Sequence, residues 1–290
     1  MGKVVTVMNM KGGVGKTTLA INLSGMIAYH RFARYPEIKK ILVIDYDPQF
    51  NLSQSFLPPK SYFELEEKRK TTLAILTDDD TELNPYELQV PGNHTPPTVS
   101  KIRTVIDTFN DGGRLDIIPS TLDLMYLALG QTNHQVKPME ERFGKFIDEC
   151  KEQYDLVIVD CHPAGSIFTK TSLRNSDIVL IPVVPDQRYS VRGIGLMLNF
   201  IQAKNHGSKG PTPYILFNRT SRIGVSTAET AIRANASYGG YCLTNTLKKY
   251  GAFAEPEGGK GFVWKSSKPY SQEAKRNLTA VTIEFLDKLK

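Results

Sequence analysis

The sequence predicts an α/β fold in which helices flank both faces of a doubly wound, mostly parallel twisted sheet. Short β-branched runs alternate with segments of helical length, which is typical of right-handed β–α–β crossovers. A glycine-rich, lysine-containing turn follows the first run. Polar residues stand directly after several later runs, at the sheet edge where ligands gather in this fold class.

The first run covers residues 4 to 8, and its short β-branched composition predicts a buried central strand. Residues 11 to 18 then read Lys-Gly-Gly-Val-Gly-Lys-Thr-Thr. Their glycines allow a turn in which backbone N–H groups face an anion. A helix expected from Thr17 to about Tyr29 aims its positive N-terminal end at the same point. The segment therefore predicts a phosphate-binding loop of a nucleoside triphosphatase.

Two lysines lie in this loop. Lys16 is expected over the β- and γ-phosphates, with the Thr17 hydroxyl on Mg²⁺. The usual pattern G-x-x-x-x-G-K-[ST] fails at its first position, which is Met10, and a second lysine, Lys11, stands at the loop mouth. We interpret Lys11 as a partner of the triphosphate, the alternative being a solvated surface charge. The nucleotide-binding residues expected here are Lys11, Gly12, Gly13, Val14, Gly15, Lys16, Thr17 and Thr18.

Five further short, β-branched runs predict strands. They cover residues 40–45, 115–119, 154–160, 178–184 and 214–218. Asp45, Asp160 and Asn218 each close one of these runs, and Asp47 follows two residues after the first. Because parallel strands end at one edge of a sheet, we expect these side chains to meet the phosphate-binding loop.

These polar residues suit the chemistry of a triphosphate. A carboxylate at Asp47 can orient or deprotonate a water beside the γ-phosphate, although Asp-Pro is also ordinary turn chemistry. Asp160 is expected to hold Mg²⁺ through water. His162 follows it, either as a plain loop histidine or as a catalytic one. The amide of Asn218 can pair with the edge of adenine.

The segment 58–113 interrupts the alternation of strands and helices. Its prolines and charged runs predict loops around short helices on the surface, so residues 1–290 are expected to form a single domain. Residues 278–289 carry apolar side chains at helical spacing. We interpret them as a last helix packed on the sheet. The alternative is a membrane-targeting amphipathic helix, which Glu284 and Asp287 on its polar face disfavour.

Charge is unevenly distributed along the chain. The net charge is +6, and residues 201–290 hold 14 Lys/Arg against 6 Asp/Glu, so the first 200 residues carry −2. This basic third indicates a polyanion partner, either nucleic acid or an anionic membrane surface. No apolar run approaches the roughly 20 residues of a membrane span, and we expect no signal peptide. Three cysteines without metal or disulfide spacing indicate a reduced, cytosolic setting.

The loop at residues 11–17 resembles the deviant Walker A box of the ParA/MinD family of P-loop ATPases. Residues 45–53, Asp-Tyr-Asp-Pro-Gln-Phe-Asn-Leu-Ser, resemble the second box of that family. The resemblance implies that Lys11 reaches the nucleotide of the other subunit in a dimer. It implies also that Asp47 is the hydrolysis residue and that Asp45 lies near the Mg²⁺ shell. It makes Lys11, Lys16 and Asp47 the catalytic set.

The resemblance extends over residues 3–55 and 115–220, and weakly to the end. The family has an asparagine at the place of Asn218, and its next strand-end loop touches the base through backbone atoms. Carried over, these features add four nucleotide-binding residues, which are Asn218, Arg219, Thr246 and Leu247. His162 departs from the family pattern, which more often has a proline at this place.

The function implied by the resemblance is that of a small ParA-type ATPase, because no helix-turn-helix segment precedes the loop. ATP and Mg²⁺ would close two subunits into a homodimer that holds nucleoid DNA in the cytoplasm regardless of sequence, without membrane insertion. A ParB-like centromere-binding partner would stimulate slow ATP hydrolysis, release the DNA and so drive segregation of a plasmid or chromosome. Candidate DNA contacts are Lys248, Lys249, Lys260, Lys265, Lys268, Lys275 and Arg276.

Three other functions compete with this one. A MinD-like membrane-associated positioning ATPase shares every nucleotide residue and differs only in its partner surface. A metal-carrier ATPase of the nitrogenase iron-protein kind needs a pair of cysteines near the dimer face, for which Cys161 alone is too few. A scaffold that binds ATP and barely hydrolyses it is the non-enzyme alternative, and Asp47 argues against it.

Overall fold

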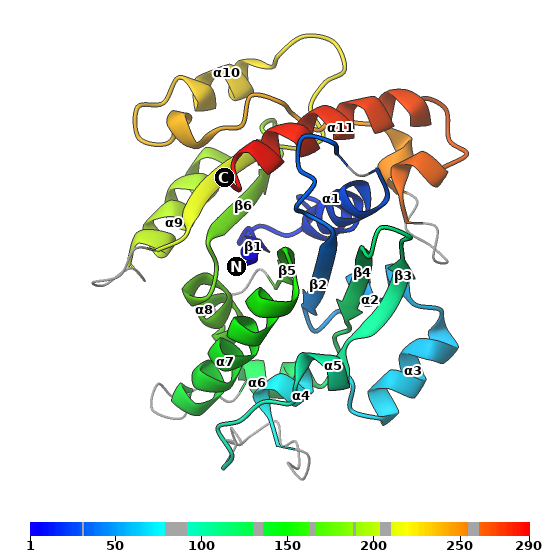
Figure 1. The fold of residues 1–290 in the computed structure, drawn as a ribbon. Coiled ribbons are helices and arrows are strands. Elements are labelled where there is room, and N and C mark those ends of the chain that lie inside the picture. Colours follow the sequence, from blue (N-terminus) through cyan, green and yellow to red (C-terminus); the bar gives the residue numbers. More distant parts are fainter. Residues whose placement is uncertain are drawn as a thin grey trace.

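The computed structural model describes residues 1–30, 32–78, 92–129, 136–162, 166–187, 190–203, 210–254 and 261–290. Within these residues, seven strands form one sheet in the order β3-β4-β2-β5-β1-β6-β7 (Figure 1). Neighbouring strands are parallel except for the pair β3–β4. The strands are β1 (Lys3–Val7), β2 (Lys40–Tyr46), β3 (Thr104–Thr108), β4 (Arg114–Ile118), β5 (Leu156–Cys161), β6 (Ile178–Val183) and β7 (Thr212–Phe217).

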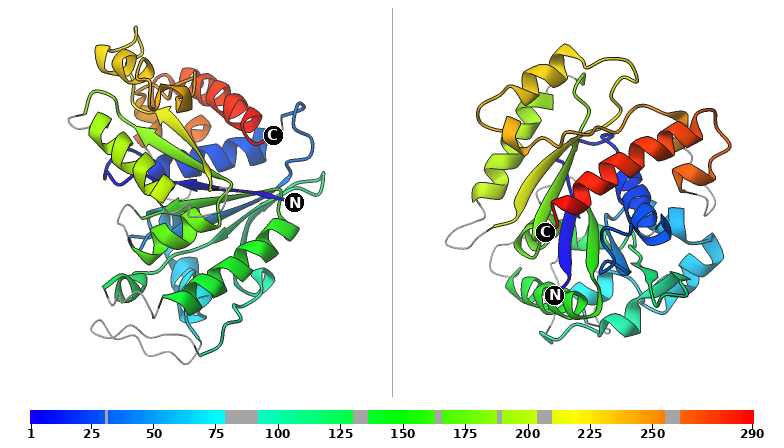
Figure 2. Two further views of the ribbon diagram at one scale, coloured as in Figure 1. Left: turned by 90° about the vertical axis from the view of Figure 1, so that its left-hand side faces the viewer. Right: turned by 45° about the horizontal axis from the view of Figure 1, so that its top comes forward.

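Helices cover both faces of the sheet, as the side-on view in Figure 2 shows. Alternate residues of each central strand enter one of two apolar cores, so β5 and β6 are buried along their whole length. The first layer holds α1 (Lys16–His30), α2 (Asn51–Phe56), α3 (Pro59–Glu67) and α11 (Ser271–Asp287). The second holds α4 (Leu73–Leu76), α5 (Val99–Ile102), α6 (Leu124–Leu129), α7 (Lys137–Gln153), α8 (Ile167–Arg174), α9 (Ser190–Ala203) and α10 (Thr227–Arg233).

The expected doubly wound sheet is confirmed, and each of the six expected strands lies within two residues of its predicted bounds. The segment 58–113 needs a correction. It contains the short helices α3, α4 and α5 as expected, but residues 104–108 form β3 instead of a loop. This strand is half exposed and pairs antiparallel with β4 at the sheet edge. Pairing with β4, more than its own residue composition, therefore makes this segment a strand.

The last helix, α11, begins at Ser271, seven residues before the predicted start. Its apolar side chains, among them Leu278, Val281 and Phe285, are buried in the core that α1 also enters. The expectation of a helix packed on the body of the protein is therefore confirmed. Among the described helices, none has the length and apolar character needed to cross a membrane.

Candidate functional site

The glycine-rich loop joins β1 to α1 at the carboxyl edge of the sheet. Gly13 and Gly15 have φ angles of +72° and +88°, a region that side chains other than glycine rarely adopt. Asn9, 5% exposed, fixes the start of the loop. Its Nδ2 donates to the Pro182 carbonyl on β6 (2.8 Å), and its Oδ1 accepts from the Lys11 N–H (2.9 Å). Sequence reasoning missed Asn9, although a polar residue directly after a buried strand was the available signal.

Lys16, the first residue of α1, lies inside the loop and is only 8% exposed. Its Nζ donates to the carbonyl oxygen of Lys11 at 3.5 Å, a long hydrogen bond within the loop itself. The amides that open α1 have no partner inside the helix, and the helix dipole adds positive potential there. The loop is therefore built to receive an anion, with Lys16 held beside it by a weak internal contact.

Two buried carboxylates face each other across neighbouring strands. The parallel register of β2 and β5 pairs Asp45 with Asp160, and both are essentially inaccessible to solvent. Both oxygens of Asp160 are buried, and neither has a hydrogen-bond partner among the described residues. Burial raises the pKa of Asp160 to about 7, with the Thr17 hydroxyl and Lys16 acting in the opposite direction. A buried carboxylate with two unpartnered oxygens calls for a cation or for water.

Asp45 differs from Asp160 because the protein itself uses its oxygens. Its Oδ2 accepts from the Ser53 N–H (2.8 Å) and hydroxyl (2.6 Å), while Oδ1 accepts from the Asp47 N–H (3.3 Å). Burial and the charge of Asp160 nevertheless raise its pKa well above the usual value. Its carboxylate ties residues 47–53 to the end of β2. A place for Asp45 near the Mg²⁺ shell stays a prediction.

The residues around Asp160 fit a magnesium ion that takes most of its ligands from elsewhere. The described part of the chain holds no cluster of three or more Asp, Glu, His or Cys that forms a metal cage. Mg²⁺ in phosphate-binding sites usually takes one or two carboxylates and completes its octahedron with water and phosphate oxygens. Thr17, at the head of α1, and the unpartnered Asp160 supply such a set, as expected from the sequence.

Asp47 lies at the rim of the same site. Its main chain is fixed because its carbonyl accepts from the Ser120 hydroxyl (2.7 Å) and the Phe50 N–H (2.9 Å). Its side chain accepts from the Gln49 N–H through Oδ1 (3.0 Å), and His162 Nε2 lies 4.0 Å from the same oxygen. The carboxylate is thus held in place while it remains partly open to solvent, with 13% of the side chain exposed.

A cavity of about 490 Å³ opens beside the loop, a suitable size for a small ligand. Its lining includes Gly15, Thr18, Asn218 and Arg219, all predicted from the sequence as nucleotide-binding residues. The amide of Asn218 is already engaged: Nδ2 donates to the Val14 carbonyl (2.8 Å) and Oδ1 accepts from the Arg219 N–H (2.8 Å). Pairing of this amide with a base requires the contact to Val14 to open.

The far wall of the cavity consists of residues 248–251 and Phe253. Thr246 and Leu247, expected to touch the base through their backbones, do not line it. Their carbonyls accept from Asn277 Nδ2 (2.8 Å) and the Thr220 N–H (3.1 Å), and the Leu247 N–H donates to Phe217. Their contact with the base stays a prediction, and the described residues of this segment that face the cavity are Lys248 to Gly251.

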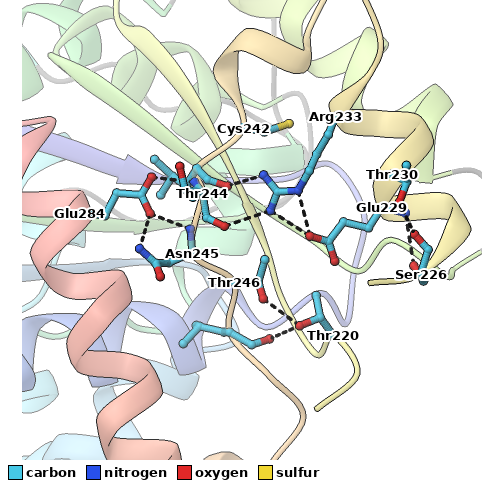
Figure 3. Close-up of polar contacts among 12 residues, drawn as sticks. Thr220, Ser226, Glu229, Thr230, Arg233, Cys242, Thr244, Asn245, Thr246 and Glu284 are labelled. Atoms are coloured by element: carbon cyan, nitrogen blue, oxygen red, sulfur yellow. Dashed lines mark hydrogen bonds and ion pairs between the residues drawn. The ribbon is translucent and has the colours of Figure 1, made fainter. Parts of the chain in front are cut away.

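Two side chains hold residues 243–245, which lead to this wall, as Figure 3 shows. Arg233 on α10 donates to the carbonyls of Leu243 (2.8 Å) and Thr244 (3.2 Å). Glu284 on α11 accepts from the backbone N–H groups of Thr244 (2.6 Å) and Asn245 (2.7 Å). The segment leading to the cavity is therefore bound on one side through its carbonyls and on the other through its amides.

A second cavity of about 620 Å³ adjoins the first and is rich in cations and aromatic rings. Arg219, Arg222, Lys249 and Lys268 line it together with Tyr250 and Tyr270, and Asp186 is its one acidic residue. The Arg222 guanidinium lies 4.8 Å from the centre of the Tyr270 ring. Sequence reasoning missed Arg222, although its place in the loop after β7 was a usable signal.

The other expected DNA contacts lie in different places. Lys265 packs over the rings of Tyr29 and Phe262, at the C-terminal end of α1. Lys275 is near the same end. Burial is the larger cause that lowers the pKa of His30, and the charge of Lys275 lowers it further. Lys248 lines the first cavity and donates to the Arg222 carbonyl (3.1 Å). Arg276 is exposed on α11, and Lys260 lies outside the described residues.

Comparison with known proteins identifies the family. A family model described as an AAA domain matches residues 2–209. The sporulation initiation inhibitor protein Soj of Bacillus subtilis is 30% identical over 205 residues, which are 70% of this chain and 66% of that protein. The chain belongs to the ParA/MinD family of P-loop ATPases.

Solved structures agree with this family at the level of the fold. A Borrelia burgdorferi protein described as a candidate plasmid partition protein, bound to AMPPNP, superimposes with a TM-score of 0.68 at 20% identity. The match covers 99% of this chain and 100% of that one. The pNOB8 ParA bound to nonspecific DNA gives a TM-score of 0.62 at 20% identity, with 100% of this chain and 99% of that one covered.

The described cysteines do not add a metal site to this ParA/MinD-family chain. Cys150 and Cys161 are buried, and Cys242 is half-buried. Burial raises the pKa of the Cys161 thiol to about 12, and Ser172 donates to its sulfur (3.5 Å). The structure therefore gives Cys161 the role of a buried core thiol, without the cysteine pair that a cluster carrier needs.

Proposed function

We propose that this chain is a ParA-type partition ATPase. It binds ATP with Mg²⁺ and pairs with a second copy of itself. The pair binds DNA without sequence preference, and hydrolysis stimulated by a ParB-like partner releases the DNA. Membership of the ParA/MinD family supports the ATPase, and the DNA-bound state of pNOB8 ParA supports the DNA partner. We further propose that residues 1–290 act as one domain.

The observation that carries the proposal is the buried, unpartnered carboxylate of Asp160 beside the loop that holds Lys16 and Thr17. Mg²⁺, when bound, supplies positive charge to the β- and γ-phosphates and fixes their orientation. Thr17 and Asp160 hold it, the latter through water. Lys16 exchanges its long contact with the Lys11 carbonyl for the phosphates, and the loop amides bind the remaining oxygens.

Asp47 acts on the attacking water. Among the described residues, the hydrogen bond to its carboxylate comes from the Gln49 N–H and goes to Oδ1, so Oδ2 can accept a proton or orient a water. Its carbonyl contacts with Ser120 and Phe50 keep the group at a fixed distance from the loop. The proton passes from water to this carboxylate as the γ-phosphoryl group leaves ADP.

Lys11 completes the site in a second copy of the chain. Its backbone is fixed by Asn9 at the mouth of the loop, and its side chain is half-buried there. A lysine donated across a dimer adds positive charge to the phosphates and makes closure of the two copies depend on ATP. This role follows from the family resemblance of the loop.

DNA binding is assigned to the second cavity and its rim. Arg219, Arg222, Lys249 and Lys268 gather there around two tyrosines. Cations of this kind bind phosphates without reading the bases. Arg219 and Lys249 line both cavities, so a change at the nucleotide is transmitted directly to the basic surface.

A gel-shift assay with ATP, ADP or no nucleotide tests the proposal. We expect the wild-type chain to retain DNA with ATP only, and Lys16→Ala and Lys11→Ala to lose this retention. Asp47→Ala should retain DNA and fail to release it. Lys60→Ala, an exposed lysine on α3, serves as a charge-matched control. Equal retention of DNA under all three nucleotide conditions would contradict the proposed switch.

No observation favours the MinD-like alternative for the described residues. The apolar side chains of α11 are buried in the core next to α1, so this helix offers no apolar face to a lipid surface. Co-sedimentation with DNA or with anionic liposomes, each with ATP at two salt concentrations, separates the two functions. We expect sedimentation with DNA, weakened by salt.

A further inference from the structure

We propose that His162 is a positioning residue for hydrolysis: its ring donates a hydrogen bond to the Asp47 carboxylate and sets the orientation of that group. This inference rests on the proposed ATPase function. His162 touches neither nucleotide nor water in it and acts through Asp47 alone. Three features of the molecule support this role: the register of the strands, the geometry of the carboxylate and the size of the gap.

The sheet places these two residues opposite each other. The register of β2 and β5 pairs Asp45 with Asp160 and Tyr46 with Cys161. The same register continues one residue further, because the His162 N–H donates to the Tyr46 carbonyl (3.3 Å). Asp47 and His162 are the first residues after the last pair of this ladder, so the register of the two strands brings them side by side. Their proximity is set where the two strands end.

The carboxylate of Asp47 is organised asymmetrically. The Gln49 N–H donates to Oδ1, and the nearest approach of His162 Nε2 is to the same oxygen. Gln49 thus holds Oδ1, His162 approaches the same oxygen, and Oδ2 is left to act on water. A carboxylate fixed through one oxygen keeps its second oxygen aimed, since rotation about the Cβ–Cγ bond is restrained.

The remaining gap is small. Nε2 and Oδ1 are 4.0 Å apart, about 1 Å longer than a hydrogen bond. Hydrogen bonds of catalytic groups are often long in ligand-free proteins and shorten when the site is filled. The His162 side chain is 20% exposed and lies at the rim of the site beside Asp47.

Matched substitutions test the role. In His162→Gln, the amide nitrogen takes the position of Nε2 and keeps the donor. In His162→Asn, the amide nitrogen takes the position of Nδ1 and falls short of Asp47. We expect kcat of ATP hydrolysis to drop about 10-fold in His162→Asn and His162→Ala, the effect typical of losing a group that orients a reacting one. His162→Gln should stay within about 3-fold of wild type, and KM should stay unchanged in all three.

A second readout does not depend on turnover. In the complex with a non-hydrolysable ATP analogue and Mg²⁺, long-range ¹⁵N NMR should show the proton of His162 on Nε2, and Asp47→Ala should shift this signal. The chain has five histidines, so the His162→Gln spectrum assigns the resonance by its absence.

The possible outcomes distinguish failure of this inference from failure of the proposed ATPase function. Wild-type turnover no faster than that of Lys16→Ala would overturn both the ATPase function and the inference. Normal wild-type turnover with equal kcat in the Gln, Asn and Ala variants would overturn the inference alone. A rise in KM in all three variants would overturn it as well, because His162 would then be binding the nucleotide itself.

Discussion

Two asparagine amides hold the glycine-rich loop from opposite sides. Asn9 fixes the N–H of Lys11 and ties it to β6 through Pro182. Asn218, at the end of β7, holds the carbonyl of Val14. The two side chains thus fix the main chain of the loop at both of its ends. Such preorganisation lowers the entropic cost of binding.

Gly15 is the loop position at which this arrangement tolerates a side chain least. A Cβ there would lie 2.4 Å from Asn218 Nδ2, and the φ angle is +88°. We expect Gly15→Ala to lower the affinity for an ATP analogue at least about 10-fold, since strain of this kind costs of order 1–3 kcal/mol. Fluorescence titration with a labelled nucleotide measures it. Gly12→Ala is the matched control, because a Cβ at Gly12 meets nothing within 4 Å. Equal losses in both variants would contradict this account.

The sequence predicted which residues lie at the site better than it predicted which contacts each of them makes. Lys16, Thr17 and Asp160 were predictable because each has a fixed place relative to a strand end or a helix start. The difference between Asp45 and Asp160 was not, because it depends on the Ser53 hydroxyl filling an oxygen of Asp45. That contact arises only when α2 folds back against the end of β2.

At the scale of elements, packing of residues 261–265 against α1 depends on a single glycine. A Cβ at Gly25 would lie 2.1 Å from the ring of Phe262. Asn22, one turn earlier in α1, accepts from the Val263 N–H (2.8 Å) and fixes the segment beside the ring. Prediction from the sequence could not find this contact, because the two parts are more than 230 residues apart.

Gly25→Ala should lower the free energy of unfolding by about 1–3 kcal/mol, the usual range for overpacking a core. Urea denaturation followed by circular dichroism measures this change. The control is Gly144→Ala in α7, where a Cβ would lie 3.5 Å from the nearest atom, an ordinary contact. It should leave the protein as stable or raise its stability by up to about 1 kcal/mol through helix propensity. Destabilisation of both variants alike would argue against a specific role for Phe262.

Glu284 is the corresponding contact between α11 and residues 244–245, which lead to the cavity wall. Partial burial alone raises its pKa, but hydrogen bonds from Asn245 and Thr244 outweigh this and hold the pKa below 4.5. The charged form therefore stabilises the fold. This contribution is complete above the ordinary pKa and is lost as the pH falls through the lower, folded value.

Glu284→Gln should accordingly cost about 1–2 kcal/mol of unfolding free energy at pH 7, typical of hydrogen bonds to a charged group. The gap from wild type should narrow as the pH falls below 4.5. Urea denaturation at several pH values between 7 and 4 measures both effects. Glu64→Gln, an exposed carboxylate on α3, should change little. A gap independent of pH would mean that the charge of Glu284 is not what stabilises the wall.

At the scale of the whole molecule, the proposed nucleotide and DNA sites are neighbouring cavities. The basic second cavity lies next to the first. Both are lined by the loop that follows β7 and by the residues that lead into η2 (Gly251–Ala254). The sequence predicted a basic C-terminal third but not this gathering. Lys265 and Lys275 share that region of the sequence but lie near the C-terminal end of α1, whereas Lys268 lines the second cavity.

We therefore expect Arg222→Ala and Lys249→Ala to weaken DNA binding more than Lys265→Ala does. Removal of one cation that binds a phosphate should reduce the slope of log affinity against log salt by about 0.9. Fluorescence anisotropy with a labelled duplex, in the ATP state at several salt concentrations, measures the slope. ATP affinity of Arg222→Ala should stay at the wild-type level, since Arg222 does not line the first cavity. An unchanged salt slope in Arg222→Ala would place the DNA elsewhere.

The aromatic cluster at the end of α1 also gives the chain a built-in reporter. Trp264 is its single tryptophan, and its ring stacks on Phe262 at 4.6 Å and meets His30 edge-on at 4.9 Å. Tryptophan fluorescence therefore reports on the packing of the helical layer that contains α1. Far-ultraviolet circular dichroism reports on the helices of both layers together. Unfolding curves from the two signals coincide only if the layers on opposite faces of the sheet melt together.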